Sequence, residues 1–406
     1  MNHIIFEQKS LKKVESHEGL HYMKGLKHIL GRGALLFLLA ATLLLAVSGG
    51  ATGKFADVSE PPSKSNETVY TGFVFSDAAG GAANAVSKSY QGKKLIPGGI
   101  AFGVKFYTKG VMVIGFDDVQ GQSTKHNPAY DAGIRKKDVI TRVDGKELTS
   151  SAQLTEAVEG AGGRAITLTY IRDGKEYTAQ VTPRYSDSEG RYKTGLWVRD
   201  SGAGIGTVTY IDPDTLAFGG LGHGICDSET GAIIPMDRGT VLGVTIGGIE
   251  KGIAGSPGEV KGYFSRTKCG SLCSNTNCGV FGIFSELPAA LPEKAMPIGE
   301  KNELREGDAY IWCTLDDSGP HRYSIKISEI NRGASGNKCF TVTVTDPKLI
   351  AKTGGIIQGM SGSPIIQNGK LVGAVTHVLI NDPTTGYGIF IENMLNAAQM
   401  PQARAS

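Results

Sequence analysis

The chain has 406 residues, of which 40% are hydrophobic, so it is long and apolar enough for two or three folded domains and is not a disordered protein. Its formal net charge of +3 comes from the first 33 residues, because residues 34–406 hold equal numbers of basic and acidic residues. A neutral body without a basic stripe argues against nucleic-acid binding. The 57 glycines, and the scarcity of helical patterns after residue 50, predict a mainly β protein of short strands and tight turns.

An uncharged apolar run, ALLFLLAATLLLAV at 34–47, follows a basic flank. It is shorter than the roughly 20 residues of an ideal membrane-spanning helix. We therefore interpret residues 1–50 as a cytoplasmic basic flank with a signal peptide or signal anchor, which places the rest of the chain across the membrane. A buried helix of a globular domain is the alternative. The polar stretch at 51–95 predicts a flexible linker.

The next residues predict strands, one helix and tight turns that contain glycine. Two apolar strands are expected over 96–116, on either side of a turn at Lys109-Gly110. Asp138 opens a further strand, and Asp144-Gly145 then marks a hairpin turn. Apolar residues at helical spacing predict a helix over 150–163 that ends in glycines. An alternating hairpin follows.

The order of these elements, with the phrase AGIRKKDVI followed by a Val-Asp-Gly turn, resembles a PDZ domain over residues 96–185. In PDZ domains, backbone N–H groups of one loop capture a peptide C-terminus, and the peptide adds a strand to the sheet edge. The resemblance places this peptide-binding loop at Ala101, Phe102, Gly103 and Val104. A rigid spacer with an empty groove is the alternative.

Six cysteines lie on the side that we expect to be translocated, where disulfides are permitted. Three of them form a local cluster, Cys269, Cys273 and Cys278. Their spacing is not that of a zinc knuckle and no histidine lies nearby, so we expect disulfides or free thiols and neither a metal nor another cofactor.

The stretch GMSGSPIIQNGKLVGAV places Ser361 in a glycine turn before two apolar strands. Serine, strand, turn and strand occur in this layout in trypsin-like active sites. A serine hydroxyl becomes a nucleophile when a base removes its proton. A turn without bulky side chains lets a substrate carbonyl approach. It also lets the N–H groups of Gly359 and Ser361 point at a developing oxyanion.

Two other phrases supply candidates for the base and the acid of a catalytic triad. His223 lies between glycines in GLGHGI, and Asp346 ends the alternating strand FTVTVT. A carboxylate fixes the tautomer of the base and stabilises its charge. His377 lies on the second strand after Ser361, so we assign it to substrate contact or packing, with a role as the base as the alternative.

The phrases FGGLGHGI, VTDPKLI, KTGGIIQGMSGSPIIQNGKLVGAVTH and NDPTTGYGIFIENML, with the PDZ pattern, resemble the stage IV sporulation protein B peptidases of endospore-forming bacteria. The resemblance implies a serine endopeptidase with a trypsin-like double β-barrel at residues 186–406. It also implies catalytic residues at His223, Asp346 and Ser361. Asp346 stands only 15 residues before Ser361, so the acid would come from a different strand than in other trypsin-like enzymes.

The resemblance further implies export into the space between the two sporulation membranes, across or anchored in the forespore membrane. There the enzyme would cleave a membrane-bound regulator of an intramembrane protease and so trigger pro-sigma-K processing. It would also trim its own N-terminal region within 51–95, with the PDZ domain taking part in self-recognition and substrate targeting.

Two other functions are compatible with parts of the pattern. One is a membrane-tethered PDZ adaptor with an inactive protease-like domain, although all three triad residue types are present. The other is an envelope quality-control protease of the HtrA type, in which PDZ modules usually follow the protease domain, whereas here the PDZ pattern comes first.

Overall fold

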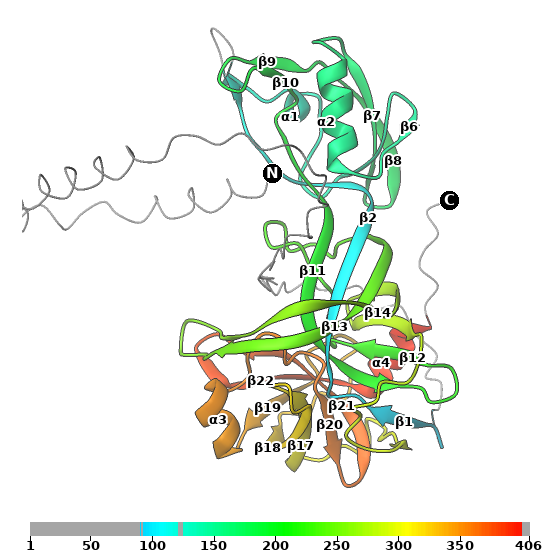
Figure 1. Cartoon of the computed structure of the whole chain (residues 1–406), viewed down its shortest axis with the longest axis vertical. Coiled ribbons are helices and arrows are strands. Elements are labelled where there is room, and N and C mark those ends of the chain that lie inside the picture. The colour runs from blue at the N-terminus through cyan, green and yellow to red at the C-terminus, as the bar shows by residue number, and fades with distance from the viewer. Residues whose placement is uncertain (1–89, 91, 121–124, 400–406) are drawn as a thin grey trace, which may run out of the picture. The chain divides into compact units, whose positions relative to one another are not determined.

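The computed structural model describes residues 90–399 except 91 and 121–124, and the described residues are mainly β (Figure 1). The strands are β1 (Lys94–Pro97), β2 (Ala101–Phe116), β3 (Val119–Gln120), β4 (Lys125–His126), β5 (Val139–Val143), β6 (Lys146–Glu147), β7 (Ile166–Arg172), β8 (Lys175–Val181), β9 (Arg184–Ser186), β10 (Arg191–Lys193), β11 (Leu196–Ile211), β12 (Ala217–Gly220), β13 (Met236–Glu250), β14 (Glu259–Thr276), β15 (Gly279–Phe284), β16 (Met296–Pro297), β17 (Gly307–Thr314), β18 (Pro320–Ser328), β19 (Phe340–Val344), β20 (Pro364–Gln367), β21 (Lys370–Leu379) and β22 (Asp382–Phe390). The helices are α1 (Pro128–Asp131), α2 (Ser151–Gly160), α3 (Pro347–Thr353) and α4 (Ile391–Ala398).

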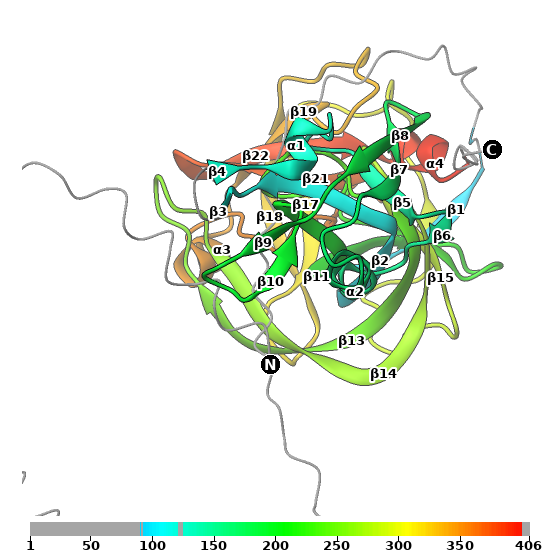
Figure 2. The same ribbon diagram turned by 90° about the horizontal axis from the view of Figure 1, so that it is seen from above.

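Six strands close into a first barrel through antiparallel pairs in the order β2, β11, β12, β15, β14, β13 and back to β2. Figure 2 shows β13 and β14 side by side as two long, curved strands. Phe102, Phe106 and Phe218 are buried in the core of this barrel. Its glycines leave room for these rings, since a Cβ at Gly202 or Gly220 would lie within 3 Å of a phenylalanine ring.

A second closed barrel contains β17, β18, β19, β22, β21 and β20 in that order. Its core includes Ile311, Val342, Ile365 and Phe390, all of which are almost fully buried. The alternating strand predicted before Asp346 is β19, in which every second residue is buried. The predicted double β-barrel is therefore confirmed.

The PDZ domain has its own apolar core between α2 and the strands β2, β5 and β7. Helix α2 begins after Ser150, whose hydroxyl accepts from the N–H of Gln153, and it buries Leu154 and Val158. Both predicted hairpin turns are present, because Asp144 and Asp173 adopt positive φ before their glycines. The predicted helix, observed at Ser151–Gly160, and the two predicted hairpins of this domain are confirmed.

The structure corrects the two strands expected around the Lys109-Gly110 turn. Residues 101–116 form one strand, β2, in which Gly110 has φ of +85°. The first half of β2 pairs with β11 and β13 in the barrel, and the second half pairs with β11 and β5 in the PDZ domain. Figure 1 shows β2 and β11 running together between the first barrel and the PDZ domain. The PDZ domain is thus inserted into the first barrel, and the boundary expected at residue 96 falls inside the barrel.

The predicted basic flank and apolar segment at 1–50, and most of the predicted linker at 51–95, lie outside the described residues. Within the part that the structure describes, no helix is long and apolar enough to span a membrane. Cys269 and Cys273 lie on β14, and Cys278 lies in the turn that follows it. The described residues contain no cluster of three or more metal-ligating side chains.

We expect Arg172→Ala to destabilise the PDZ domain strongly. Asp138 is fully buried, and Arg172 holds its two carboxylate oxygens through Nε and Nη2 at 2.7 Å each. Removing one partner of a buried ion pair leaves an uncompensated charge, which costs about 3–5 kcal/mol. The free energy of opening the PDZ domain, measured by amide hydrogen exchange, should fall by that amount.

The matched control is Arg142→Ala, which breaks the exposed pair of Arg142 with Glu176. That change should cost no more than about 1 kcal/mol. Equal effects of the two substitutions would contradict a specific role for the buried pair.

Candidate active site

Ser361 lies in a tight turn that only glycine neighbours allow. Gly359 and Gly362 have φ of +97° and +94°, a region that residues with a Cβ rarely adopt. A Cβ on Gly362 would come within 2.0 Å of the carbonyl oxygen of Thr207, and one on Gly359 would come within 2.9 Å of Val260. The glycines that flank the serine are therefore required both by the backbone conformation and by close packing.

Strand β11 of the first barrel holds this turn. The buried hydroxyls of Thr207 and Thr209 donate to the carbonyl oxygens of Gly359 and Gly362, both at 2.8 Å. The N–H of Thr207 also donates to the carbonyl of Ser361 at 3.0 Å. Three hydrogen bonds from one strand thus fix the position of the serine turn on the second barrel.

Ser361 itself is almost completely buried. Its Oγ donates to the carbonyl oxygen of Thr376 at 2.7 Å, on β21. Hydrogen bonds between catalytic groups commonly tighten only in the substrate complex, so this contact defines a resting position of the hydroxyl.

His223 follows β12 of the first barrel and is buried. Its Nδ1 lies 2.9 Å from the carbonyl oxygen of Gly224, which can only accept, so Nδ1 carries the proton and Nε2 carries the lone pair. Burial lowers the pKa of His223 below its ordinary value of 6.5, and the hydrogen bond to Gly224 partly opposes this shift. The imidazole is therefore neutral at pH 7 and able to accept a proton.

The turns that contain Ser361 and His223 pack directly on each other. A Cβ on Gly362 would come within 2.5 Å of the backbone nitrogen of Leu221, and one on Gly222 would come within 2.9 Å of the Thr376 methyl group. The structure thus brings together the predicted nucleophile, from the second barrel, and the predicted base, from the first.

His377 lies beside His223, with the two ring centroids 5.0 Å apart and the planes tilted by 41°. It is buried on β21, and burial, His223 and Lys338 together lower its pKa to about 2. Both imidazoles are neutral at pH 7. The structure places His377 next to the candidate base, while a role in substrate contact stays a prediction.

Asp346 does not lie against His223. It is the N-cap of α3, where its carboxylate accepts from the N–H groups of Lys348 and Leu349 and also from that of Ser324. The carboxylate makes its hydrogen bonds to these residues and none to His223. An aspartate before a proline at the first helical position is the usual start of a helix. This local role explains why the carboxylate faces the helix, while the catalytic role of Asp346 stays a prediction.

The two predicted oxyanion donors have oriented peptide groups. The carbonyl of Gln358 accepts from Val260 N–H at 2.9 Å, and the carbonyl of Met360 accepts from the N–H and Oγ of Ser363 at 2.9 and 2.6 Å. In a trans peptide the N–H points opposite to the C=O. The N–H groups of Gly359 and Ser361 therefore point away from these anchors.

The predicted peptide-binding loop at Ala101, Phe102, Gly103 and Val104 is corrected by the structure. These residues form the start of β2. All four pair with β11, and Gly103 and Val104 also pair with β13 on the other side. Phe102 and Val104 are buried in the core of the first barrel. The four residues thus form a barrel strand and not a loop for a peptide carboxylate.

Sequence reasoning did not identify Thr207 and Thr209 as functional residues. They are alternate residues of β11, so both face the serine turn. Alternating threonines are also common on ordinary strands, and their partners lie more than 150 residues away in the sequence. No local signal distinguishes them.

We expect His377→Gln to make the fold less sensitive to acid. The pKa of His377 is about 2 in the folded protein and near 6.5 when unfolded, so the unfolded chain binds the extra proton first as the pH falls below 6.5. Wild-type stability should then fall by up to about 1.4 kcal/mol per pH unit more than that of the variant. Urea unfolding at pH 7, 6 and 5 measures this difference.

The matched control for this experiment is His321→Gln, which removes an exposed imidazole. Identical pH slopes for the wild type and His377→Gln would contradict the expectation.

Two solved structures are similar to this chain at low sequence identity. The PDZ domain of the SdrC-like protein Lmo2051 from Listeria monocytogenes is 23% identical, with a TM-score of 0.19; the match covers 22% of this chain and 87% of that one. The protease Rv3671c of M. tuberculosis, in its inactive form, is 14% identical with a TM-score of 0.28; the match covers 48% of this chain and 85% of that one. The double barrel follows from the strand pairings of this chain alone.

Two curated relatives match over short segments. "Putative zinc metalloprotease LL2128" of Lactococcus lactis is 34% identical over 76 residues, which are 19% of this chain and 17% of the relative. "Putative zinc metalloprotease BH06270" of Bartonella henselae is 30% identical over 112 residues, which are 28% of this chain and 30% of the relative. The chain thus spans less than a third of the length of either relative.

Two family models match this chain. The PDZ domain model matches residues 99–182, which agrees with the inserted domain. The model described as SpoIVB peptidase S55 matches residues 190–395, which is half of the chain and includes both His223 and Ser361. The chain therefore belongs to the SpoIVB peptidase S55 family.

Proposed function

We propose that this chain is a serine endopeptidase, with Ser361 as its nucleophile and His223 as its general base. The observation that carries the proposal is the packing of the two turns, together with a neutral imidazole whose Nδ1 carries the proton. His223 removes the proton as Ser361 Oγ attacks the peptide carbonyl carbon, and it returns that proton to the leaving amine. Water then hydrolyses the acyl-enzyme by the same steps in reverse order.

The N–H groups of Gly359 and Ser361 are proposed to stabilise the oxyanion. Both belong to peptide groups whose carbonyls are held from the opposite side, so the donors need no reorganisation when charge develops. Fixed donors of this kind contribute most to catalysis when they are aimed at the charge of the transition state. Asp346 begins the helix α3 that precedes the serine turn, and its role as the acid of the triad stays a prediction.

The proposed biological role is sporulation signalling between membranes. Membership of the SpoIVB family supports cleavage of a membrane-bound regulatory protein that controls an intramembrane protease and so triggers pro-sigma-K processing. The apolar segment at 34–47 supports export across, or anchoring in, the forespore membrane, with action in the intermembrane space. The polar stretch at 51–95 is the proposed region of self-cleavage.

The PDZ domain is proposed to present substrates, including a second copy of this chain, to the peptidase. Its insertion between β2 and β11 supports this role, because β11 is also the strand that holds the serine turn. Self-recognition through the PDZ domain would then concentrate the N-terminal region near the active site.

We expect Ser361→Ala to abolish both peptide cleavage and labelling by a fluorophosphonate, because no hydroxyl remains to attack. Mass spectrometry of residues 50–406 after incubation should show loss of fragments from 51–95 in the wild type only. Exposed Ser271→Ala is the control and should behave as the wild type. Cleavage by Ser361→Ala would refute the assignment of the nucleophile.

The rate of fluorophosphonate labelling should depend on pH through His223. The neutral imidazole is the active form and its pKa is lowered by burial, so the rate should rise with pH and reach its plateau with a midpoint below 6.5. His223→Ala should remove the labelling almost completely, and the double variant with Ser361→Ala should be no worse. A midpoint above 6.5 would argue against His223 as the base.

A further inference from the structure

The acceptor for the Nδ1 proton of His223 is a backbone carbonyl, that of Gly224. In a Ser-His-Asp triad this place is taken by a buried carboxylate, which fixes the tautomer and stabilises the imidazolium. A carbonyl can do the same only if its peptide plane cannot rotate away. The question is therefore what fixes the peptide between Gly224 and Ile225.

Asn275, near the end of β14, holds this peptide. Its Oδ1 accepts from the N–H of Ile225 at 2.8 Å, and its Nδ2 donates to the carbonyls of Ile225 and Ile234 at 2.9 and 3.0 Å. The orientation of the amide is unambiguous, because the reverse one would place Oδ1 against two carbonyl oxygens. Asn275 thus ties both sides of the loop that contains His223 to the first barrel.

The geometry of a trans peptide makes this contact directly relevant to His223. The C=O of Gly224 and the N–H of Ile225 belong to one planar unit and point in opposite directions. When Asn275 accepts from that N–H, the carbonyl points toward the imidazole and becomes a better acceptor, because hydrogen bonds in a chain polarise one another. A Cβ at Gly224 would come within 2.7 Å of the carbonyl of Thr276, so the peptide also lies tightly against β14.

The same loop contains a carboxylate, that of Asp227, which makes other contacts. Asp227 is fully buried, and its Oδ1 accepts from the N–H groups of Glu229 and Thr230. Its Oδ2 lies 2.6 Å from Nε of Arg199 on β11. These contacts occupy both oxygens of Asp227, so the loop supplies its carboxylate to Arg199 and its backbone carbonyl to His223.

We propose that Asn275 is a positioning residue for catalysis, which acts on His223 through the peptide of Gly224. It keeps the proton on Nδ1, so that Nε2 is the nitrogen that accepts the proton of Ser361, and it helps the carbonyl stabilise the imidazolium that forms during attack. The proposal rests on the proposed function, in which His223 is the base.

The test uses the full chain and a fluorophosphonate probe, which needs no knowledge of the natural substrate. Ser361 Oγ attacks phosphorus, fluoride leaves and His223 takes the proton, so the maximal rate of labelling reports on the base and the half-saturating probe concentration reports on binding. Asn275→Leu keeps the number and branching of the side-chain heavy atoms and removes all three hydrogen bonds. The maximal rate should fall about 10- to 100-fold, as for loss of other groups that orient a functional side chain, with half-saturation changed by less than about threefold.

Asn275→Asp separates positioning from simple stabilisation of the loop. Its carboxylate still accepts from the Ile225 N–H, but its second oxygen faces the carbonyls of Ile225 and Ile234, which is repulsive. Asn275→Asp should therefore be no more stable than Asn275→Leu and yet label faster. The negative charge should also move the acidic limb of the rate profile to higher pH. If labelling rates merely follow stability, the positioning role is wrong.

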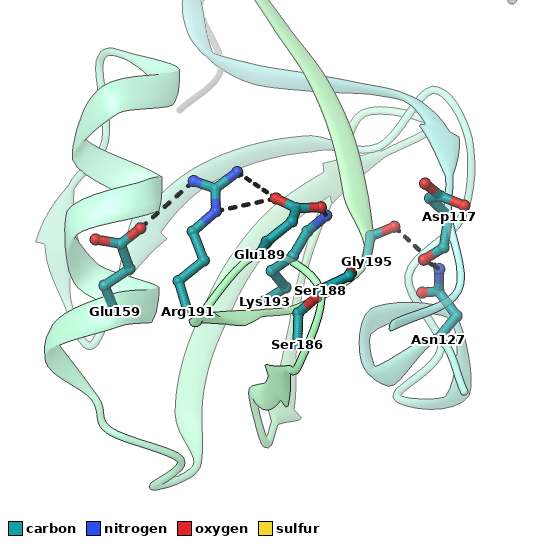
Figure 3. A network of polar contacts seen from close by, with 9 residues as sticks. All are labelled: Asp117, Asn127, Glu159, Ser186, Ser188, Glu189, Arg191, Lys193 and Gly195. Atoms are coloured by element: carbon teal, nitrogen blue, oxygen red, sulfur yellow. Dashed lines mark hydrogen bonds and ion pairs between the residues drawn. The ribbon is translucent and has the colours of Figure 1, made fainter. Parts of the chain in front are cut away.

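The chain offers a matched control in the PDZ domain. Figure 3 shows Asn127, whose Nδ2 donates to the carbonyls of Asp117 and Gly195. Its Oδ1 accepts from the N–H of Tyr130 at 2.9 Å, so it makes the same three kinds of bond as Asn275. Asn127→Leu should leave the maximal labelling rate within twofold of the wild type.

The outcomes distinguish this inference from the proposed function. If His223→Ala labels like the wild type, or the wild type does not label, the assignment of the base fails and this inference fails with it. If His223→Ala is inactive while both Asn275 variants label at the wild-type rate, only the role of Asn275 is overturned. If Asn275→Leu does not fold, the rate and pH profile of Asn275→Asp decide the question alone.

Discussion

The site depends on the hydrogen bonds that strand β11 makes to the turn of Ser361. The hydroxyls of Thr207 and Thr209 reach carbonyls on the second barrel, while the chain beyond β11 leads through β12 to His223 on the first. One strand thus fixes the nucleophile and positions the base. Loss of either hydroxyl would leave a buried carbonyl without its partner, which costs about 1–3 kcal/mol. Two barrels that merely packed through apolar side chains would not hold these groups in register.

Electrostatics at this site depends on burial. His223 and His377 are both neutral because the charged form of an imidazole is poorly solvated in the barrel junction. A neutral base is ready for use, but the imidazolium that forms during catalysis needs stabilisation. The carbonyl of Gly224, which lies 2.9 Å from Nδ1 of His223, is a backbone dipole that can contribute to it.

Features set by local chemistry were predictable from the sequence. The turn of Ser361 follows from glycines at positive φ, and the hairpins of the PDZ domain follow from Asp-Gly pairs. Gly110 was misread because positive φ at a glycine serves a bend within a strand as well as a hairpin turn. The N-cap role of Asp346 was not predicted, because a helix N-cap and a catalytic acid use the same residue type. The position of Ala101 in a barrel strand could not be predicted from the sequence, since it depends on pairing with Thr207 about a hundred residues later.

The insertion of the PDZ domain has a consequence for how the molecule unfolds. Tyr107 and Ser201 are partners in the β2–β11 pair, so the inserted domain is, in topological terms, a very long hairpin loop of the first barrel. The entropic cost of closing a flexible loop rises only with the logarithm of its length. Melting of the PDZ domain would therefore leave the barrel hairpin closed at little extra cost. The stability of the peptidase core should then depend little on whether the PDZ domain is folded.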